Sequence, residues 1–373
     1  MLKKLGIKQF TGFPQADFEF GPGLNVIIGD NGTGKTHVLK LGYLFCRAWP
    51  DLMRKGMRLN TKRAESYFEE RLAGLFRIAD LGELIRHSHK NGAKLSAEVV
   101  GNIPTIQITM PAEKLLSRGL PECMLWEVRL QRAKGQAVRI EANTIPEEAA
   151  VNAFVVQSIF VPSKEIVSMF KGLIGLFEAY RQFPLDETYK DLAVALATLE
   201  PAAPSPLLSE VGQRIATLLG GELRLVNDDL VFEQKDGRTL DSHLMAEGHR
   251  KLAMLLYLVR YRIIEMGSTV FWDEPEANLN PAAIRLLAEA LYALTGQGVQ
   301  VIVATHSLFL LREFEVLSRG QEKQTAASTR YFSLGRTRKG IIVSAGNETV
   351  DIDPLVLLDE DLAQSDRFME TLE

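Results

Sequence analysis

The sequence GDNGTGKT at residues 29–36 has the residue types and the spacing that bind nucleotide phosphates. In the pattern GxxxxGK[ST], the glycines let consecutive backbone N–H groups turn toward a phosphate, and the helix that follows adds its positive N-terminus. Lys35 would reach the β- and γ-phosphates, and the Thr36 hydroxyl would complete the coordination of Mg²⁺. The alternative is a chance glycine turn, but the apolar strand pattern before the motif and the helical pattern after it favour a phosphate-binding loop.

Two acidic residues and a histidine follow apolar runs much later in the chain. STVFWDE, residues 268–274, is an apolar strand pattern that ends in Asp273 and Glu274. Asp273 is placed to hold Mg²⁺, directly or through water, and Glu274 is placed to polarise an attacking water. The run VQVIVATHS ends in His306, near the expected γ-phosphate end of parallel strands. Solvated acids at a strand end and a structural histidine are the alternatives.

The elements around these residues alternate between strands and helices. A β-branched run at 24–30 predicts a buried parallel strand, and the apolar spacing after the glycine loop predicts a helix. Alternation over 95–145 indicates an antiparallel β portion, and 164–219 is mostly helical. A hairpin is expected around 227–229, and a long helix from about Gly248. We therefore predict an α/β fold with an insertion.

The composition predicts a folded protein of the cytoplasm. The chain has 373 residues, of which 46% are hydrophobic and 24% are charged, and its formal charge is −4. We divide it into an ATPase lobe at 1–160, a helical insertion at 161–220 and a second ATPase lobe at 221–373. Cys46 and Cys123 stand alone, which is typical of a reducing compartment. The longest apolar run is far too short to span a bilayer, so we expect no membrane association.

Several segments resemble one branch of the ABC-class ATPases. FWDEPEANLNP, followed by VIVATHS, resembles the Walker B, D-loop and H-loop series of that class. The opening IKQFTGFPQADFEFGPGLNVIIGDNGTGKT is similar to the RecF, SMC and overcoming-lysogenization-defect (OLD) branch. AEGHRKLAMLLYLV matches the position of the ABC signature, and IFVPSKE resembles a segment of small prokaryotic "AAA family ATPase" proteins, many of which are encoded in phage-defence operons. The likeness covers about 1–40 and 221–311, plus the short segment at Ile159.

The resemblance implies a P-loop NTPase fold, an ABC-type ATPase head with an antiparallel β portion and a helical insertion. Two such heads enclose two ATP molecules, and each ATP contacts the signature segment of the other protomer. His249 and the residues before it would then act across a dimer interface, whereas the residues alone favour an ordinary amphipathic core helix there. The predicted catalytic residues are Lys35, Glu274 and His306; the predicted nucleotide-binding residues are Gly29, Asp30, Asn31, Gly32, Thr33, Gly34, Lys35, Thr36, His37, Ala246, Glu247 and Gly248; the predicted Mg²⁺ ligands are Thr36 and Asp273.

The sequence departs from the pattern of the class at three points. The signature serine is replaced by Ala246, which removes one hydroxyl donor to the γ-phosphate, and the D-loop aspartate is replaced by Asn280. No standard Q-loop glutamine can be fixed, and either Gln157 or the run 163–165 would occupy that neighbourhood. Because Walker A and Walker B are intact, we expect ATP binding and slow hydrolysis.

The predicted function is an ATP-binding and ATP-hydrolysing head that dimerises around ATP in a bacterial anti-phage defence or DNA-maintenance system. The expected partners are a second copy of the chain, in a homodimer or higher oligomer, and a separate effector, a nuclease or a toxin. Nucleic acid binding stays open, because the basic cluster at 54–63 could contact phosphates or form a solvated face. His87 and His89 lack further ligands at metal-binding spacing. The alternatives are a nucleotide-gated scaffold with little turnover, a transporter ATPase subunit and a small-molecule P-loop kinase.

Overall fold

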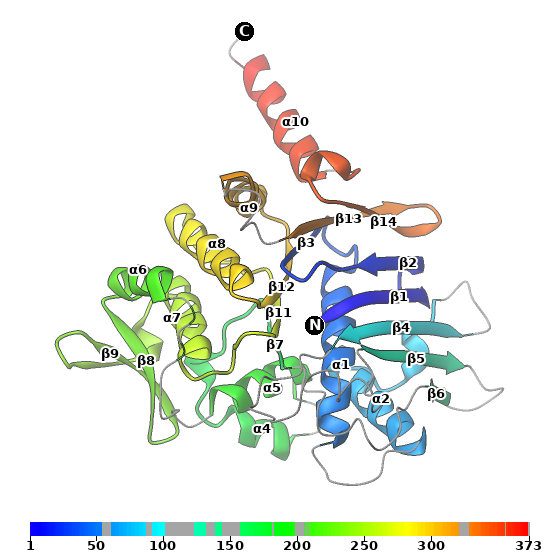
Figure 1. Ribbon diagram of the computed structural model, residues 1–373, viewed down its shortest axis with the longest axis horizontal. Helices are drawn as coiled ribbons and strands as arrows, with labels where there is room; N and C mark the ends of the chain where they lie inside the picture. The colour runs from blue at the N-terminus through cyan, green and yellow to red at the C-terminus, as the bar shows by residue number, and fades with distance from the viewer. Residues whose placement is uncertain are drawn as a thin grey trace, which may run out of the picture.

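The structure is a computed structural model in which two large β-sheets lie on either side of the helix that follows the glycine loop (Figure 1). Within the described part of the chain, no helix has the length and apolarity that crossing a membrane requires. The described residues are 1–53, 61–86, 92–100, 123–131, 139–143, 157–180, 183–197, 205, 207, 209–320, 328–354 and 356–371.

The first sheet is antiparallel, and the antiparallel portion predicted over 95–145 corresponds to three of its five strands. Successive side chains of a strand point to opposite faces, so Leu5 and Ile7 are buried on its inner face while Lys4 and Lys8 are exposed on the outer face. The strand order is β2 (Phe13–Glu19), β1 (Leu2–Phe10), β4 (Ala93–Val100), β5 (Cys123–Gln131) and β6 (Arg139–Asn143).

The second sheet has six strands and is parallel except for its edge strand β14. The carboxyl ends of its parallel strands therefore meet at one edge, where the glycine loop, the acidic pair and His306 follow three neighbouring strands. The strand order is β14 (Gly340–Gly346), β13 (Thr329–Thr337), β3 (Leu24–Gly29), β12 (Gln300–Thr305), β11 (Thr269–Asp273) and β7 (Ser158–Val161).

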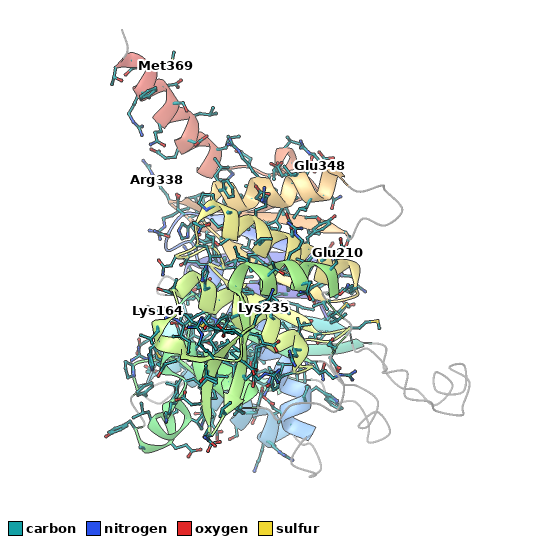
Figure 2. All side chains as sticks on the ribbon, turned by 90° about the vertical axis from the view of Figure 1, so that its left-hand side faces the viewer. Lys164, Glu210, Lys235, Arg338, Glu348 and Met369 are labelled. Atoms are coloured by element: carbon teal, nitrogen blue, oxygen red, sulfur yellow. The ribbon has the colours of Figure 1, made fainter. Side chains whose placement is uncertain are left out.

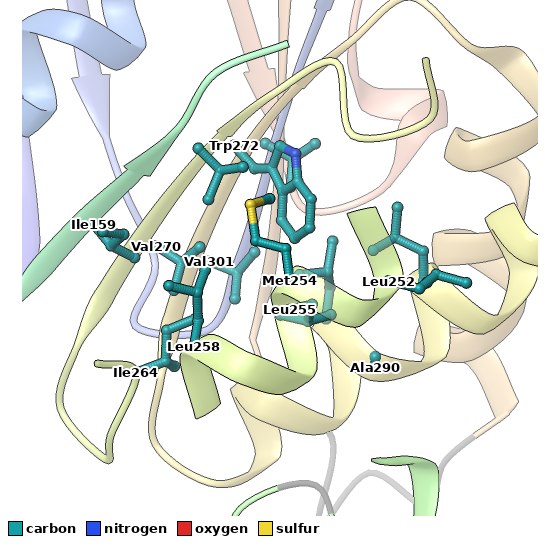
Figure 3. Close-up of a cluster of buried hydrophobic side chains, with 14 of the residues drawn as sticks. Ile159, Leu252, Met254, Leu255, Leu258, Ile264, Val270, Trp272, Ala290 and Val301 are labelled. Atoms are coloured by element: carbon teal, nitrogen blue, oxygen red, sulfur yellow. The ribbon is translucent and has the colours of Figure 1, made fainter. Parts of the chain in front are cut away.

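Helices cover the second sheet on both faces, and alternate strand residues divide between two cores. On β11, Phe271 faces the α1 side, where its ring centroid lies 6.0 Å from that of Tyr43. Trp272 packs on the other side with Met254 of α7 (Figure 3). Burial on both faces explains why these strands read as continuous apolar runs. The α1 face carries α1 (Lys35–Met53), and α2 (Thr61–Phe76) packs between α1 and β6 of the first sheet; the other face carries α7 (Glu247–Arg260), α8 (Pro281–Gly296) and α9 (Leu308–Gly320).

The remaining elements lie around these layers. The expected hairpin at 227–229 is confirmed, because its turn connects β8 to β9 of a small three-stranded sheet. The predicted lobe boundary at residue 160 falls inside β7, whose strand pairs with β11 of the other lobe. The acidic C-terminal segment 356–370 is an exposed helix, and it projects from the body (Figure 1). These elements are α4 (Leu173–Ala179), α5 (Glu187–Leu196), α6 (Ser209–Leu219), β8 (Gly221–Val226), β9 (Asp229–Gln234), β10 (Thr239–Asp241) and α10 (Val356–Glu370).

Candidate nucleotide site

The glycine loop connects the end of β3 to the start of α1. Gly29 has φ of +149° and lies against the backbone of Leu334, whereas Gly34 has φ of +89° and a side-chain carbon at that position would lie only 2.7 Å from the ring of Phe13. Side chains would be strained at both positions, which explains the glycines. Lys35 Nζ donates to the carbonyl oxygens of Gly29 at 2.7 Å and Asp30 at 3.0 Å, so the lysine lies across its own loop.

Thr36 and Asp273 join the glycine loop to the end of β11. The Thr36 hydroxyl donates to Asp273 Oδ2 at 2.8 Å, although 237 residues separate the two. The second oxygen, Oδ1, is buried and has no hydrogen-bond partner, and burial raises the pKa of Asp273 to about 6. A hydroxyl next to an unpartnered carboxylate oxygen is a donor set that suits Mg²⁺, whose charge would stabilise the ionised carboxylate. The predicted metal ligands therefore fit the ion.

Glu274 is held in an unusual backbone conformation. Its φ is +47°, in the left-handed region that non-glycine residues seldom occupy. The Glu274 N–H donates to Ala304 at 2.8 Å, and its carbonyl accepts from Ala277 at 3.1 Å and from Lys251 Nζ at 3.5 Å. These contacts direct the carboxylate away from the strand and into the cavity that the glycine loop lines. Lys251, buried on α7, also donates to the carbonyl of Ala277 at 2.8 Å.

His306 lies beside two carboxylates at the end of β12. Its Nδ1 is 3.3 Å from Glu274 Oε1 and 3.9 Å from Glu276 Oε1. Glu276 is buried and accepts from the Thr305 hydroxyl at 2.6 Å and from the His306 N–H at 3.3 Å. Glu276 therefore holds the backbone that carries the histidine. Sequence reasoning missed this role, because nothing in the run DEPE marks its third acid as buried alongside Asp273.

A cavity of 440 Å³ lies over the glycine loop. Among the predicted site residues, it brings together Asn31, Gly32, Gly34, Lys35, Thr36, His37 and Glu274. His37 packs edge-on against Phe10 and Phe76, and its Nδ1 lies 3.2 Å from the Thr11 hydroxyl. Burial lowers the pKa of His37 to about 4, so the ring is neutral at pH 7. Three arginines that the sequence did not single out, Arg86, Arg336 and Arg338, also line this cavity.

The signature-like residues do not line this cavity. Ala246 is the N-cap of α7 and its side chain makes no capping hydrogen bond. Glu247 accepts from Asn278 Nδ2 at 2.7 Å, and a side-chain carbon on Gly248 would lie 2.8 Å from Leu279. The first turn of α7 thus packs on the loop after β11 of its own chain, which by itself accounts for the glycine.

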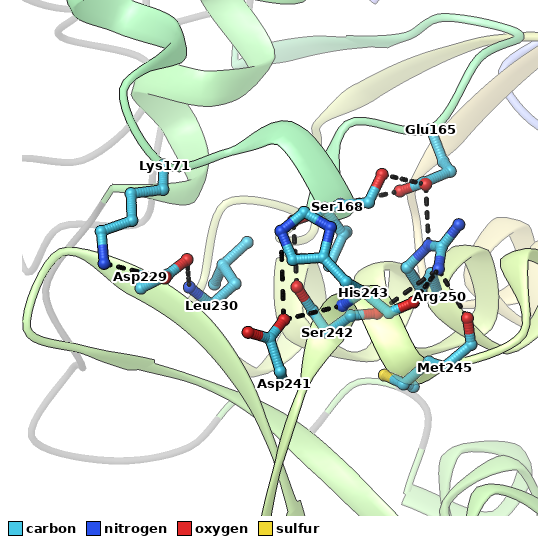
Figure 4. A network of polar contacts seen from close by, with 11 residues as sticks. Glu165, Ser168, Lys171, Asp229, Leu230, Asp241, Ser242, His243, Met245 and Arg250 are labelled. Atoms are coloured by element: carbon cyan, nitrogen blue, oxygen red, sulfur yellow. Dashed lines mark hydrogen bonds and ion pairs between the residues drawn. The ribbon is translucent and has the colours of Figure 1, made fainter.

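Arg250 ties the same turn to the segment after β7. Its Nε donates to Glu165 Oε1 at 2.7 Å, and Nη1 donates to the carbonyl of Met245 at 2.5 Å (Figure 4). Glu165 is buried, and its Oε1 also accepts from the Ser168 hydroxyl at 2.6 Å. The run 163–165 follows the carboxyl end of β7 and so lies at the edge of the sheet that carries Asp273.

The structure excludes Gln157 from the neighbourhood of a Q-loop. The Gln157 carbonyl accepts from the N–H of Thr269, the first residue of β11, at 2.8 Å. Gln157 therefore lies at the amino-terminal edge of the parallel strands, opposite Asp273, because β7 and β11 run in the same direction. Of the two alternatives, Gln157 is therefore excluded and the run 163–165 is left, since a residue just before a strand cannot reach the edge where the strand ends.

Asn280, at the altered D-loop position, caps α8. Its Oδ1 accepts from the Ala283 N–H at 2.9 Å, and Pro281 is the first residue of the helix. Of the basic cluster, Arg54, Lys55 and Arg58 lie outside the described residues, as do His87 and His89. Among the described residues, no group of three or more His, Cys, Asp or Glu side chains forms a metal site.

Two family models match the chain. One described as "AAA domain" matches residues 4–159, which contain the glycine loop, and one described as "AAA domain, putative AbiEii toxin, Type IV TA system" matches residues 211–312, which contain β11 and His306. The chain is 27% identical over 134 residues to the DNA replication and repair protein RecF of Streptococcus suis (strain 05ZYH33), covering 32% of this chain and 35% of that protein. It is 29% identical over 118 residues to the Old nuclease of Escherichia phage P2, covering 29% of this chain and 18% of that protein.

Solved structures of SMC heads share the fold. The SmcHead bound to the C-winged helix domain of ScpA gives a TM-score of 0.53 at 13% identity, covering 92% of this chain and 97% of that one. The Smc head domain with an extended coiled coil, bound to the C-terminal domain of ScpA derived from Pyrococcus furiosus, gives 0.54 at 13% identity, covering 100% and 99%. Identity this low shows the fold alone.

The chain has the fold and the motifs of an ABC-class ATPase head. Its sequence relatives and its structural neighbours are similar to it as members of the RecF, SMC and OLD branch of that class. The matched segment spans only about a third of the RecF relative and under a fifth of the Old nuclease.

Proposed function

We propose that the chain binds and slowly hydrolyses ATP, and that two copies close head to head around the nucleotide. The observation that carries this proposal is the 2.8 Å contact between Thr36 and Asp273, which joins the glycine loop to the acidic strand end. Next to it, Glu274 and His306 approach within 3.3 Å on the cavity side. One edge of the sheet therefore offers groups for phosphate, metal and water.

Each of these groups has a chemical role in phosphoryl transfer. Lys35 and the loop N–H groups would hold the β- and γ-phosphates, and Glu274 would orient the attacking water and accept its proton. His306 would donate to the γ-phosphate from its place beside Glu274. When bound at Thr36 and Asp273, Mg²⁺ would neutralise charge that builds on the phosphates.

The position of α7 supports closure by a second copy. Its first turn is absent from the cavity of its own chain, while Ala246 and His249 are exposed and the helix end lacks a side-chain cap. A helix N-terminus with free N–H groups attracts anions. In a head-to-head pair, this turn would face the γ-phosphate that the partner holds.

The names of the relatives support a role in DNA maintenance, and a role in anti-phage defence is the second form of this proposal. RecF is named for DNA replication and repair, and Old is named as a nuclease. The description of one matching family model includes a putative toxin. We propose that this head works with a separate effector protein, a nuclease or a toxin, which ATP-driven closure controls. DNA or RNA would then be a ligand of the assembly.

Light scattering of the Glu274→Gln variant tests the dimer. Removing the water-activating carboxylate should slow hydrolysis by about 10²- to 10⁴-fold and trap the closed pair, so we expect a monomer that becomes a dimer only with MgATP. Glu265→Gln is the matched control, because that carboxylate pairs with Arg262 in the turn before β11. A variant that binds ATP yet stays monomeric would contradict autonomous closure.

A nucleotide-gated scaffold with little turnover is the second candidate. The observation that favours it is Ala246, which offers no hydroxyl at the uncapped start of α7. Phosphate release by the wild type over many cycles, lost in Glu274→Gln, would exclude the scaffold. Stoichiometric binding of ATP without release of phosphate would favour it over the ATPase.

A further inference from the structure

The hairpin of β13 and β14 runs past the edge of the sheet on one side of the glycine loop. Leu334 of β13 pairs in parallel with Gly29, the last residue of β3, so the residues after Leu334 lie beside the loop rather than beside the strand. β12 and β11, which carry His306, Asp273 and Glu274, lie on the other side of β3. The hairpin tip and the acidic edge therefore flank the loop from opposite sides.

Contacts hold this tip against the first sheet. Arg86 donates to the carbonyl of Lys339, and the N–H of Ile341 donates to the carbonyl of Gly12 at 3.0 Å. Gly340 has φ of +121° and approaches the same Gly12 carbonyl so closely that a side-chain carbon would lie 2.7 Å from it. The tip is thus a fixed wall of the cavity.

Arg336 and Arg338 belong to this wall, and both line the cavity. Arg336 Nη2 donates to the carbonyl of Gly32 at 2.8 Å. Arg338 lines the same cavity and lies at the surface (Figure 2), and no described residue forms an ion pair or hydrogen bond with it. An arginine at a cavity wall without a carboxylate partner is a recognition group for phosphate.

The cavity as a whole favours an anion. Its lining has four cationic side chains, Lys35 and the three arginines, and a single carboxylate, Glu274, on the far side of β3. His37 adds no charge at pH 7, because burial keeps it neutral. The excess positive charge lies on the hairpin side of the cavity. The Walker motifs contribute no charged side chain to that side.

We propose that Arg336 and Arg338 bind the bound nucleotide on the side of its α-phosphate, away from the γ-phosphate. The hairpin then forms a third phosphate-contacting element beside the glycine loop and the acidic edge. This inference rests on the proposed ATP site and adds to it the residues that hold the nucleoside end. Because these arginines lie opposite Glu274, they contact ADP and ATP alike.

Calorimetric titration of single variants tests this placement. Binding of MgADP is measured with the otherwise wild-type chain, and binding of MgATP in the Glu274→Gln background. Arg336→Ala and Arg338→Ala should each weaken both nucleotides about tenfold, the usual worth of a charge-assisted hydrogen bond. Lys339→Ala, which removes the same charge from the same tip without lining the cavity, should change either affinity by less than about twofold.

The outcomes separate this inference from the ATP site itself. If Lys35→Met abolishes binding while Arg336→Ala and Arg338→Ala match Lys339→Ala, the hairpin role is wrong and the ATP site stands. If Lys35→Met has no effect, the ATP site is wrong and the hairpin role falls with it. If the variants lost affinity for MgATP but not for MgADP, the arginines would contact the γ-phosphate. That result would overturn their proposed position beside the α-phosphate. Arg338→Ala decides the case, because Arg336 also braces Gly32 and its loss could act through the loop.

Discussion

The acidic edge at Asp273 and the first turn of α7 touch each other but are completed in different ways. At the edge, Thr36, Thr305 and the His306 N–H donate to the carboxylates of Asp273 and Glu276 from within the chain, and one oxygen of each carboxylate stays without a partner. The turn of α7 is braced from behind by Glu165 and Asn278, while its helix end and Ala246 face outward without a cap. A small ligand such as a metal ion is enough to complete the polar contacts of the acidic edge. The first turn of α7 needs the surface of another molecule to cover it.

Lys251 connects the two regions. It is buried on α7, and its ammonium group donates to carbonyls of the loop that carries Glu274. Burial lowers the pKa of Lys251, and the neighbouring carboxylates of Glu247, Glu276 and Glu274 oppose that shift. Lys251 therefore links the loop that carries Glu274 directly to α7.

The largest expected effect comes from breaking the brace behind α7. Arg250→Met removes the partner of buried Glu165 and should lower the free energy of unfolding by about 3 kcal/mol, because an unpaired buried carboxylate costs that much. Urea unfolding measures it. Arg285→Met is the matched control, since Arg285 is exposed on α8 and its 3.9 Å pair with Glu289 should be worth under about 0.5 kcal/mol. If Arg250→Met and Arg285→Met lowered the free energy of unfolding equally, the pair of Arg250 with Glu165 would have no special role in stability.

A smaller effect is expected from Glu276→Gln at the acidic edge. The amide keeps the shape and one acceptor for Thr305, but it removes the charge beside His306 and puts an N–H₂ group where Oε2 is buried without a partner. We expect kcat to fall about tenfold while nucleotide affinity stays within about twofold, as for a residue that positions a catalytic group. Steady-state phosphate release and calorimetry measure the two quantities. A parallel loss of affinity would mean that Glu276 shapes the binding loop itself.

The sequence predicts the glycine loop, β3, α1 and β11 well, because periodicity and motif spacing are local properties. It does not predict the hairpin at Arg336, since β13 joins β3 through a pairing between residues about 300 positions apart. It also cannot tell that Glu276 is buried as well as Asp273, because the partner of Glu276, Thr305, lies on the neighbouring strand. The choice left open between Gln157 and the run 163–165 has the same origin, since strand direction decides which edge a flanking residue reaches.

Asn280 tests whether the altered D-loop position acts in structure or in catalysis. Asn280→Ala removes the cap of α8 and should lower the free energy of unfolding by about 1 kcal/mol. Asn280→Asp keeps a capping acceptor and restores the residue usual in the class, so stability should stay within about 0.5 kcal/mol. Thermal unfolding and phosphate release are compared for both variants. Faster turnover by Asn280→Asp at unchanged stability would give this position a catalytic role beyond the cap.

The smallest effect is expected at the N-cap of α7, which lacks a side-chain hydrogen bond. Ala246→Ser supplies a hydroxyl that can cap the helix end, and it should raise the free energy of unfolding by about 0.5 kcal/mol. If the turn also faces a partner's γ-phosphate, the hydroxyl adds a donor there, and ATP-driven dimerisation of the Glu274→Gln variant should tighten several-fold. Light scattering across a concentration series measures this. A gain in stability without tighter dimerisation would mean that the first turn of α7 is only a helix end packed on its own chain.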